Sequence, residues 1–154
     1  MSADQQPARY VEPDRWTRRL LNPAVAWLTR RGLSVYGSRV LAVRSRTSGE
    51  WRTTPVNLLT VDGERYLVAP RGETQWVRNL RATGSGELRV GHRVEAFAAD
   101  EVDDTAKPPL LRAYLRRWRF EVKTFFAGVG PEATDEELRR IAEGYPVFVV
   151  RPAA

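Results

Sequence analysis

Two arginines flank a Ser-Gly pair in the segment 46–55, whose sequence is RTSGEWRTTP. Guanidinium groups bind phosphate and carboxylate through paired hydrogen bonds. Thr47 and Ser48 add hydroxyl groups, and a tight turn adds backbone N–H groups that can point toward an anion. This combination indicates a site for a phosphate or polycarboxylate group. The alternative is a set of solvated arginines that keep the edge of a sheet soluble.

Hairpin register predicts that further arginines reach the same corner. A two-residue Asp-Gly loop after Val61, typical of hairpins, would place Thr54 beside Arg71. A second turn at the Ser-Gly pair would place Arg46 opposite Trp51. The arginines that this register brings together are Arg46, Arg52 and Arg71. Because like charges repel, their arrangement is easiest to understand if an anion lies among them.

A short helix is predicted directly after this corner, over residues 75–82, with Thr74 as its N-cap. The N-terminus of a helix carries unpaired N–H groups and partial positive charge, which also suit an anion. Gln75 and Asn79 lie one turn apart on one face, where an amide pair could bind a heterocycle or its side chain. Trp76 is either a core residue or one wall of the ligand site.

An antiparallel sheet must position these residues. Apolar alternation and turn signals predict strands at 39–45, 52–61, 64–69, 88–90, 94–98 and 146–151. Helices are predicted after Pro108-Pro109 and, from a capping box, after Thr134. The strands near 56–61 and 66–69 are apolar on both faces, which predicts a closed barrel with helices outside it. We therefore expect an α+β fold made mainly of antiparallel strands.

Composition bounds the kind of protein. The 154 residues suit a polar leader at 1–13 and one domain at 14–154. The chain has no cysteine and a single histidine, which excludes disulfides, thiolate nucleophiles and Cys-ligated or His-rich metal sites, so no metal is expected. Its 25 Lys and Arg residues against 19 Asp and Glu give a formal charge of +6, which favours an anionic partner.

The segment 15–31 predicts a basic amphipathic helix that either packs on the domain or lies on an anionic membrane. No apolar run approaches a signal peptide or the ~20 residues of a membrane span. We expect a cytoplasmic protein with peripheral contact at the inner face of the cell membrane through Arg15–Arg31. Nucleic-acid binding is not expected, because no strand pair combines exposed aromatic and basic residues into a stacking platform.

The motifs RTSGEWRTTPV, DGERYLVAPRG, WVRNLRA and LRVGHRVEAFAA, in this order, resemble the deazaflavin-dependent nitroreductase and quinone reductase family of actinobacteria. Members of that family are split β-barrels, similar to flavin reductases and FMN-binding proteins, that use coenzyme F-420, an 8-hydroxy-5-deazaflavin. The similarity covers residues 39–99. Two departures concern the coenzyme tail and the acceptor: Thr47 stands where a lysine is usual, and Asn57 where an aromatic residue can follow.

The resemblance implies roles for the residues of the arginine corner and its surroundings. The phosphate and oligoglutamate tail would be bound by Arg46, Thr47, Ser48 and Arg52. The deazaflavin would pass beside Thr54, Pro55 and Val56. The site would be completed by Ala69, Pro70, Arg71, Gln75, Trp76 and Asn79.

The reaction that the resemblance implies is hydride transfer from the reduced deazaflavin to a quinone, nitroaromatic or activated alkene. The proton at the acceptor would come from solvent or from Tyr114, although Tyr114 lies on an apolar stripe typical of a core residue. The rival hypotheses are an FMN-binding barrel oxidoreductase and a non-enzymatic basic module that binds membrane or nucleic acid. Apolar strands covered on both sides would also allow a homodimer.

Overall fold

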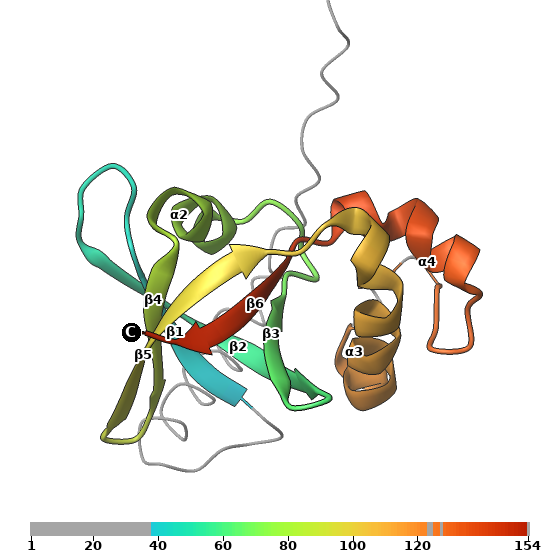
Figure 1. The fold of residues 1–154 in the computed structure, drawn as a ribbon, viewed down its shortest axis with the longest axis horizontal. Coiled ribbons are helices and arrows are strands. Elements are labelled where there is room, and N and C mark those ends of the chain that lie inside the picture. The colour runs from blue at the N-terminus through green and yellow to red at the C-terminus, as the bar shows by residue number, and fades with distance from the viewer. Residues whose placement is uncertain (1–37, 123–124, 127, 154) are drawn as a thin grey trace, which may run out of the picture.

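The structure is a computed structural model that describes residues 38–122, 125–126 and 128–153. Its strands close into a barrel in the order β1-β2-β3-β6-β5-β4, with every neighbouring pair antiparallel (Figure 1). The strands are β1 (Ser38–Arg44), β2 (Trp51–Val61), β3 (Glu64–Val68), β4 (Ser85–Val90), β5 (Arg93–Glu101) and β6 (Val147–Pro152). The helices are α2 (Gln75–Thr83), α3 (Lys107–Val122) and α4 (Asp135–Ile141), with short 3-10 turns at Asp104–Ala106 and Ala142–Gly144. The expected barrel of antiparallel strands is therefore confirmed.

The β2–β3 hairpin forms as its sequence predicts. Asp62 and Gly63 have φ angles of 51° and 80°, which are the positive values that the favoured two-residue hairpin turns require. Val61 consequently pairs with Glu64, as expected. The pairing ends at Leu58 and Leu67, and on its other edge β3 pairs with β6 from Arg65 to Val68.

The barrel interior is an apolar cluster to which almost every strand contributes. Leu41, Leu67 and Phe97 are each 0% exposed, and Phe148 is 2% exposed. Helix α2 lies over one end of the barrel and adds Val77 and Leu80 to the same cluster (Figure 1). This packing fixes α2 relative to the ends of β1 and β2.

A second apolar cluster covers the outer face of the barrel. Helices α3 and α4 contribute Leu111, Trp118 and Leu138, which pack with Leu59 and Val68 from β2 and β3. Figure 1 shows the two helices side by side, beyond β3 and β6. The prediction that these strands are covered on both faces is thus confirmed.

Strand β4 begins earlier than predicted, at Ser85, and β5 extends to Glu101. The Gly-Ser-Gly sequence at 84–86 is typical of a loop, yet Gly86 pairs with Phe97 inside the ladder. A Cβ atom on Gly86 would lie 2.6 Å from the Ala42 carbonyl oxygen and 2.9 Å from the Phe97 ring. Glycine therefore serves close strand packing here, which local composition does not reveal.

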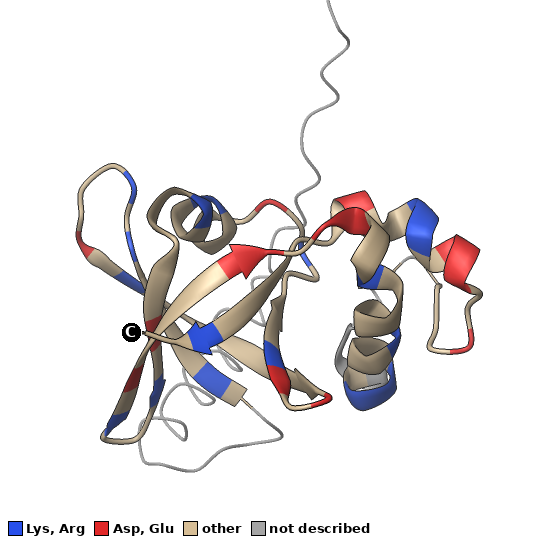
Figure 2. Cartoon of the chain, in the orientation of Figure 1, with Lys and Arg blue, Asp and Glu red and all other residues tan. Residues whose placement is uncertain are grey.

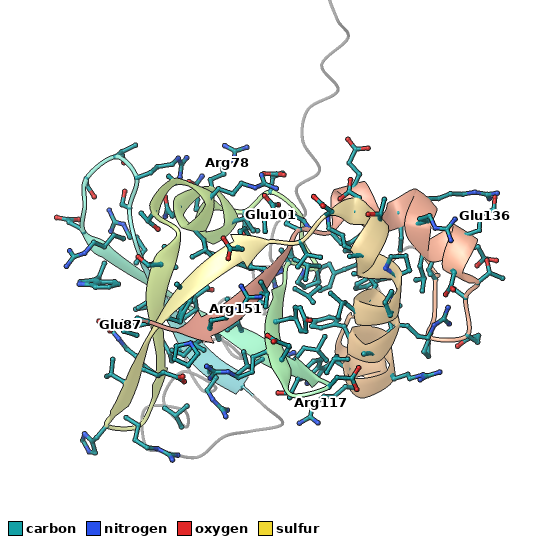
Figure 3. All side chains as sticks on the ribbon, in the orientation of Figure 1. Arg78, Glu87, Glu101, Arg117, Glu136 and Arg151 are labelled. Carbon is teal, nitrogen blue, oxygen red and sulfur yellow. The ribbon has the colours of Figure 1, made fainter. Side chains whose placement is uncertain are left out.

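Basic and acidic residues are both spread along the described ribbon (Figure 2). The side chains of Arg78, Arg117 and Glu136 project away from the body of the molecule (Figure 3). The predicted leader at 1–13 and the predicted helix at 15–31 lie outside the described residues. No helix within the described part of the chain is long and apolar enough to cross a membrane.

Candidate functional site

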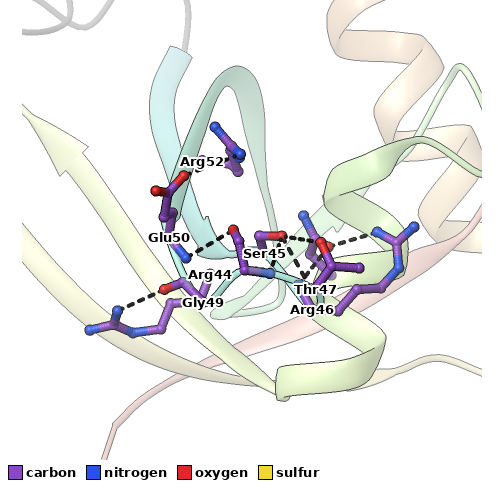
Figure 4. Close-up of polar contacts among 9 residues, drawn as sticks. Arg44, Ser45, Arg46, Thr47, Gly49, Glu50 and Arg52 are labelled. Atoms are coloured by element: carbon purple, nitrogen blue, oxygen red, sulfur yellow. Dashed lines mark hydrogen bonds and ion pairs between the residues drawn. The ribbon is translucent and has the colours of Figure 1, made fainter.

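The loop between β1 and β2, residues 45–50, is folded around the side chain of Ser45 (Figure 4). The Ser45 hydroxyl oxygen accepts hydrogen bonds from the backbone N–H groups of Thr47 and Ser48, at 3.3 and 3.2 Å. The backbone N–H of Gly49 bonds the Ser45 carbonyl oxygen at 2.9 Å, and the Ser45 N–H bonds the Glu50 carbonyl oxygen at 2.7 Å. Ser45 thus replaces the tight turn that the Ser-Gly pair predicts.

The register predicted for this hairpin is wrong by two residues on β1. Arg44 pairs with Trp51 and Val43 with Arg52, so Arg46 lies in the loop and not opposite Trp51. Two of the backbone N–H groups that were expected to point toward an anion are not available, because those of Thr47 and Ser48 donate hydrogen bonds to the Ser45 hydroxyl. The loop therefore exposes side-chain groups, namely the Arg46 guanidinium and the hydroxyls of Thr47 and Ser48.

Arg46 is bound to α2 through two side-chain amides. Its Nη1 donates to Gln75 Oε1 at 3.0 Å and to Asn79 Oδ1 at 2.8 Å, and its backbone N–H donates to Asn79 Oδ1 at 3.1 Å. Asn79 is 4% exposed. The sequence predicted this helix, its face and its proximity to the arginine corner, and the structure brings all three residues together.

Among the described residues, the side-chain acceptors of Arg46 are neutral amides that do not compensate its positive charge. An amide oxygen orients a guanidinium group without neutralising it, unlike a carboxylate. Arg52 does have a carboxylate partner, Glu50 Oε2 at 3.3 Å, but the two side chains are 63% and 70% exposed. Such an exposed pair is weak and exchanges readily for another anion. From Arg44 to Arg52 the chain carries three arginines and one glutamate.

Trp51 lies between two further arginines at the edge of this loop. The Arg44 guanidinium carbon is 4.4 Å from the centre of the Trp51 ring, and that of Arg89 is 5.5 Å from it. Arg44 Nη1 also donates to the Gly49 carbonyl oxygen at 3.0 Å. These contacts hold the loop against β1 and β4. Arg44 adds positive charge to the corner, whereas Arg89 is paired with Glu87, whose Oε2 lies 2.8 Å from its Nη2.

Helix α2 is held in place by ion pairs at its other side. Arg81 donates to both carboxylate oxygens of Glu101, at 2.8 and 2.6 Å, and also contacts the carboxylate of Glu73. The Glu101 hydrogen bond raises the pKa of Arg81 above its ordinary value. These bonds join α2 to β5 and to the segment before the helix. They therefore fix the face that carries Gln75 and Asn79.

Thr74 stands at the N-cap of α2, but its hydroxyl makes no capping hydrogen bond. The Thr74 Oγ1 atom is buried and has no hydrogen-bond partner among the described residues. The predicted cap position is therefore correct, whereas the predicted capping bond is absent. At α4 the expected bond does form, from the Glu137 N–H to Thr134 Oγ1 at 3.1 Å.

Arg71 does not reach the corner by the predicted route. Strand β3 ends at Val68, so Thr54 has no strand partner at Arg71 and the predicted register is wrong there. The Arg71 guanidinium lies 5.3 Å from the centre of the Phe125 ring, beyond α3. Its role in binding an anion stays a prediction.

The other residues singled out from the sequence line β2 and the approach to α2. Thr54 pairs with Leu41, Pro55 with Val40 and Val56 with Arg39, so Thr54 and Val56 share the face of β2 that Pro55 does not. All three are half-buried, as is Pro70. Ala69 is 1% exposed, whereas Trp76 is half-buried with its ring centre 6.0 Å from that of Phe148. Trp76 therefore combines a core contact with an exposed edge.

Tyr114 lies in the other layer of the molecule. It is 2% exposed, and its ring centre is 4.9 Å from that of Trp118 and 6.2 Å from that of Phe126. This burial supports the core interpretation of Tyr114, and its role as a proton donor stays a prediction.

Comparison with protein families gives one match over most of the chain. The model of a family described as F420H(2)-dependent quinone reductase matches residues 25–124. This range contains the loop at 45–50, strand β2 and helix α2. No curated protein matches the chain.

Solved structures share the fold. An F420-H2 dependent reductase, FDR-A, has a TM-score of 0.53 and 16% identity over 75% of this chain and 94% of its own. A structure described as a domain-swapped dimer has a TM-score of 0.55 and 16% identity, and the match covers 88% of this chain and 97% of that one. Atu2129, a protein of unknown function from Agrobacterium tumefaciens, has a TM-score of 0.55 and 16% identity. That match covers 94% of this chain and 58% of Atu2129.

Proposed function

The chain belongs to the family of quinone reductases that depend on the reduced deazaflavin coenzyme F-420, and from this premise we propose how its own residues serve that reaction. The protein transfers a hydride from the reduced coenzyme to a quinone, a nitroaromatic compound or an activated alkene. The observation that carries the proposal is Arg46, which two neutral amides hold in place and which has no carboxylate partner within residues 38–122, 125–126 and 128–153.

The residues present fit a coenzyme with a polyanionic tail. Arg46 supplies a guanidinium group from the exposed loop and Arg52 supplies another from the start of β2, and Thr47 and Ser48 supply hydroxyls in the loop. A phosphate and several carboxylates can stay partly solvated at such an open site. An open site therefore suits a long anionic tail better than a closed phosphate pocket would. Thr47 provides an uncharged hydroxyl, so Arg46 and Arg52 must supply most of the charge.

The ring system would lie between β2 and the start of α2. Thr54 and Val56 offer a half-buried surface, and Gln75 and Asn79 offer amide groups at the edge of α2. Trp76 presents the exposed part of its ring next to this face, where it can contact a flat heterocycle. Pro55, Ala69, Pro70 and Arg71 complete the proposed surroundings.

The coenzyme supplies the hydride, and the protein supplies position and electrostatics. Arg46 and Arg52 hold the tail, so the binding energy of a remote group orients the reacting ring. Residues Thr54 and Val56 limit the access of water to that ring. The proton that the acceptor needs comes from solvent or from Tyr114, and Tyr114→Phe separates these two sources. Loss of turnover in a folded variant with unchanged coenzyme affinity would assign the proton to Tyr114.

The experiment has a binding arm and a turnover arm. The full chain is titrated with coenzyme F-420 and, separately, with FMN, while cofactor fluorescence is recorded. Saturable binding of the deazaflavin at lower concentration than FMN is the expected result. The reduced coenzyme is then mixed with menadione and its oxidation is followed by absorbance, with a protein-free control. Tighter binding of FMN would replace the proposal with the FMN-dependent alternative.

Two further expectations stay predictions. The first is a homodimer, since one solved structure of the same fold is described as a domain-swapped dimer. Sedimentation of the full chain would test it. Peripheral membrane contact, and with it a cytoplasmic location at the inner face of the membrane, depends on residues 15–31, which lie outside the described residues. Co-sedimentation with anionic vesicles would test that contact.

A further inference from the structure

Trp51 lies between two arginines beside the loop at 45–50, and the chemistry proposed for the coenzyme site does not use it. It is the first residue of β2 and is 38% exposed. The Arg44 guanidinium carbon is 4.4 Å from the centre of its ring, and that of Arg89 is 5.5 Å from it. Both distances are within the range in which an aromatic ring attracts a guanidinium group. The ring therefore joins two basic side chains that come from β1 and β4.

The contact between Trp51 and Arg89 crosses β1, which lies between β2 and β4 in the barrel. On β1, Arg44 is the partner of Trp51. Val40 is the partner of Arg89. Ala42 stands between these two positions on the same face of β1 and is 0% exposed. This is the outer face, because the alternate residues of β1 belong to the interior cluster. The small side chain of Ala42 leaves room for the longer ones to meet above it.

The stacked ring is anchored at both of its sides. On β4, Arg89 is bound to Glu87, with Nε and Nη2 at 2.9 and 2.8 Å from Oε2. On β1, Arg44 Nη1 donates to the Gly49 carbonyl oxygen at 3.0 Å (Figure 4). Gly49 has a φ angle of 74°, which glycine adopts most readily, and it is the point where the loop turns back toward β2. The stack thus connects a carboxylate on β4 to the backbone of the loop.

The loop at 45–50 is consequently held from two sides. On the side of α2, the backbone N–H and the guanidinium of Arg46 both donate to Asn79 Oδ1. On the side of β4, the connection runs through Arg44 and Trp51. A loop fixed on one side only would sample more conformations before binding. Ordering it when a ligand binds would then cost affinity.

We propose that Trp51 is a positioning residue for the anionic tail of the coenzyme. It acts on the loop through Arg44 and not by direct contact with the coenzyme. By holding the loop in place, it presents Arg46, Thr47 and Ser48 to the tail before the tail arrives. This inference rests on the proposed function, because it requires the tail to bind at this loop.

The test uses two ligands, coenzyme F-420 and the same deazaflavin without phosphate and glutamates. The full chain and its variants are titrated with each, and cofactor fluorescence is recorded. Trp51→Ala should weaken binding of the complete coenzyme about three- to tenfold, as expected for the loss of two cation–π contacts at an exposed site. It should leave the affinity for the tailless deazaflavin unchanged, because only the loop is loosened. Trp51→Phe keeps an aromatic ring and should retain most of the affinity.

A charge-neutral variant tests the same stack from β4. The double substitution Glu87→Gln with Arg89→Gln removes the anchored guanidinium without changing the net charge of the protein. It should weaken binding of the complete coenzyme in the same direction as Trp51→Ala, by a smaller factor. The matched control is Glu136→Gln with Arg140→Gln, which removes an exposed ion pair from α4. This control should bind both ligands as wild type does.

Three results would overturn the positioning role of Trp51. The first is a folded Trp51→Ala protein that binds the complete coenzyme within twofold of wild type. The second is an equal loss for both ligands, which general damage to the fold would produce. The third is a Trp51→Phe protein that loses as much affinity as Trp51→Ala. A wild-type chain that binds both ligands equally well would instead overturn the tail site itself, and this inference with it.

Discussion

The two ends of the barrel use arginine in opposite ways. At the α2 end, Arg46 is oriented by the amide oxygens of Gln75 and Asn79, at 3.0 and 2.8 Å. At the far end, Arg65 is bound by both oxygens of Glu95, at 2.7 and 2.6 Å. Both guanidinium groups are positioned by hydrogen bonds, but only the second is neutralised by its partner.

The difference shows that the hydrogen-bond partner of an arginine decides whether its charge is available to a ligand. A carboxylate makes the arginine a structural bond between two strands. An amide fixes the direction of the side chain and leaves its charge for a ligand. A count of basic residues cannot separate these cases, since the chain has an excess of +6 in total.

The largest expected effect is that of Arg46→Gln on coenzyme binding. Removal of a charged hydrogen-bond donor should cost about 1.5–3 kcal/mol, which is roughly a 10- to 150-fold weaker affinity for coenzyme F-420. Fluorescence titration measures this, with Arg140→Gln as the control for a lost surface charge. An affinity within twofold of wild type in a folded Arg46→Gln protein would end the assignment.

A smaller effect is expected on stability from Asn79→Ala. The Asn79 side chain is 4% exposed and accepts from both the backbone N–H and the guanidinium of Arg46. Its loss should lower the free energy of unfolding by about 1–3 kcal/mol, because the partner groups are left unsatisfied. Urea unfolding gives this value. A stable variant with unchanged coenzyme affinity would mean that the amide does not position Arg46.

Arg52→Ala should weaken coenzyme binding less than Arg46→Gln does. Arg52 is 63% exposed and has Glu50 as a partner, so we expect a change below about 1 kcal/mol. The same titration measures it, and moderate salt should reduce the difference from wild type. If Arg52→Ala proved the more damaging of the two, the charge at this corner would reside on β2 and not in the loop.

The smallest expected effect is that of Glu95→Gln at the opposite end. The hydrogen bond from Arg65 holds the pKa of Glu95 below its ordinary value of 4.5. A lowered carboxyl pKa stabilises the fold above the unfolded-state value, and this contribution is lost as the pH falls through the folded-state value. Because the pair is partly exposed, we expect a loss of about 0.2–1 kcal/mol at neutral pH.

Urea unfolding of wild type and Glu95→Gln across acidic pH provides the check. The difference between the two proteins should shrink as the pH is lowered below 4.5. A difference that grew on acidification would contradict the sign of the Arg65–Glu95 interaction.

Features that depend on adjacent residues could be predicted from the sequence. Asp62-Gly63 forces a hairpin by its own backbone preference, and Gln75 and Asn79 share a face because of helical periodicity. The short helix, the barrel and the proximity of Arg46 to α2 followed from such local rules. The terminal strand was also placed within one residue of Val147–Pro152.

Features that depend on one side chain or on segments far apart in the sequence could not be predicted. Ser45 redirects the loop by accepting two backbone N–H groups, and its only sequence signal is a serine two and three residues before Thr47 and Ser48. The Arg71 guanidinium contacts the ring of Phe125, a residue that follows α3 in the sequence. The pocket of about 560 Å³ at the far end of the barrel is lined by residues of five strands, β1 to β5, and exists only once the barrel closes.

The central claim is that the arginine corner binds the anionic tail of the coenzyme. The most direct measurement compares the affinity of the wild-type chain for coenzyme F-420 with its affinity for the same deazaflavin without phosphate and glutamates, at low and moderate salt. The account predicts that the complete coenzyme binds about tenfold more tightly or better, with an advantage that falls as salt is raised. Equal affinities at both salt concentrations would contradict it, because the tail would then contribute nothing to binding.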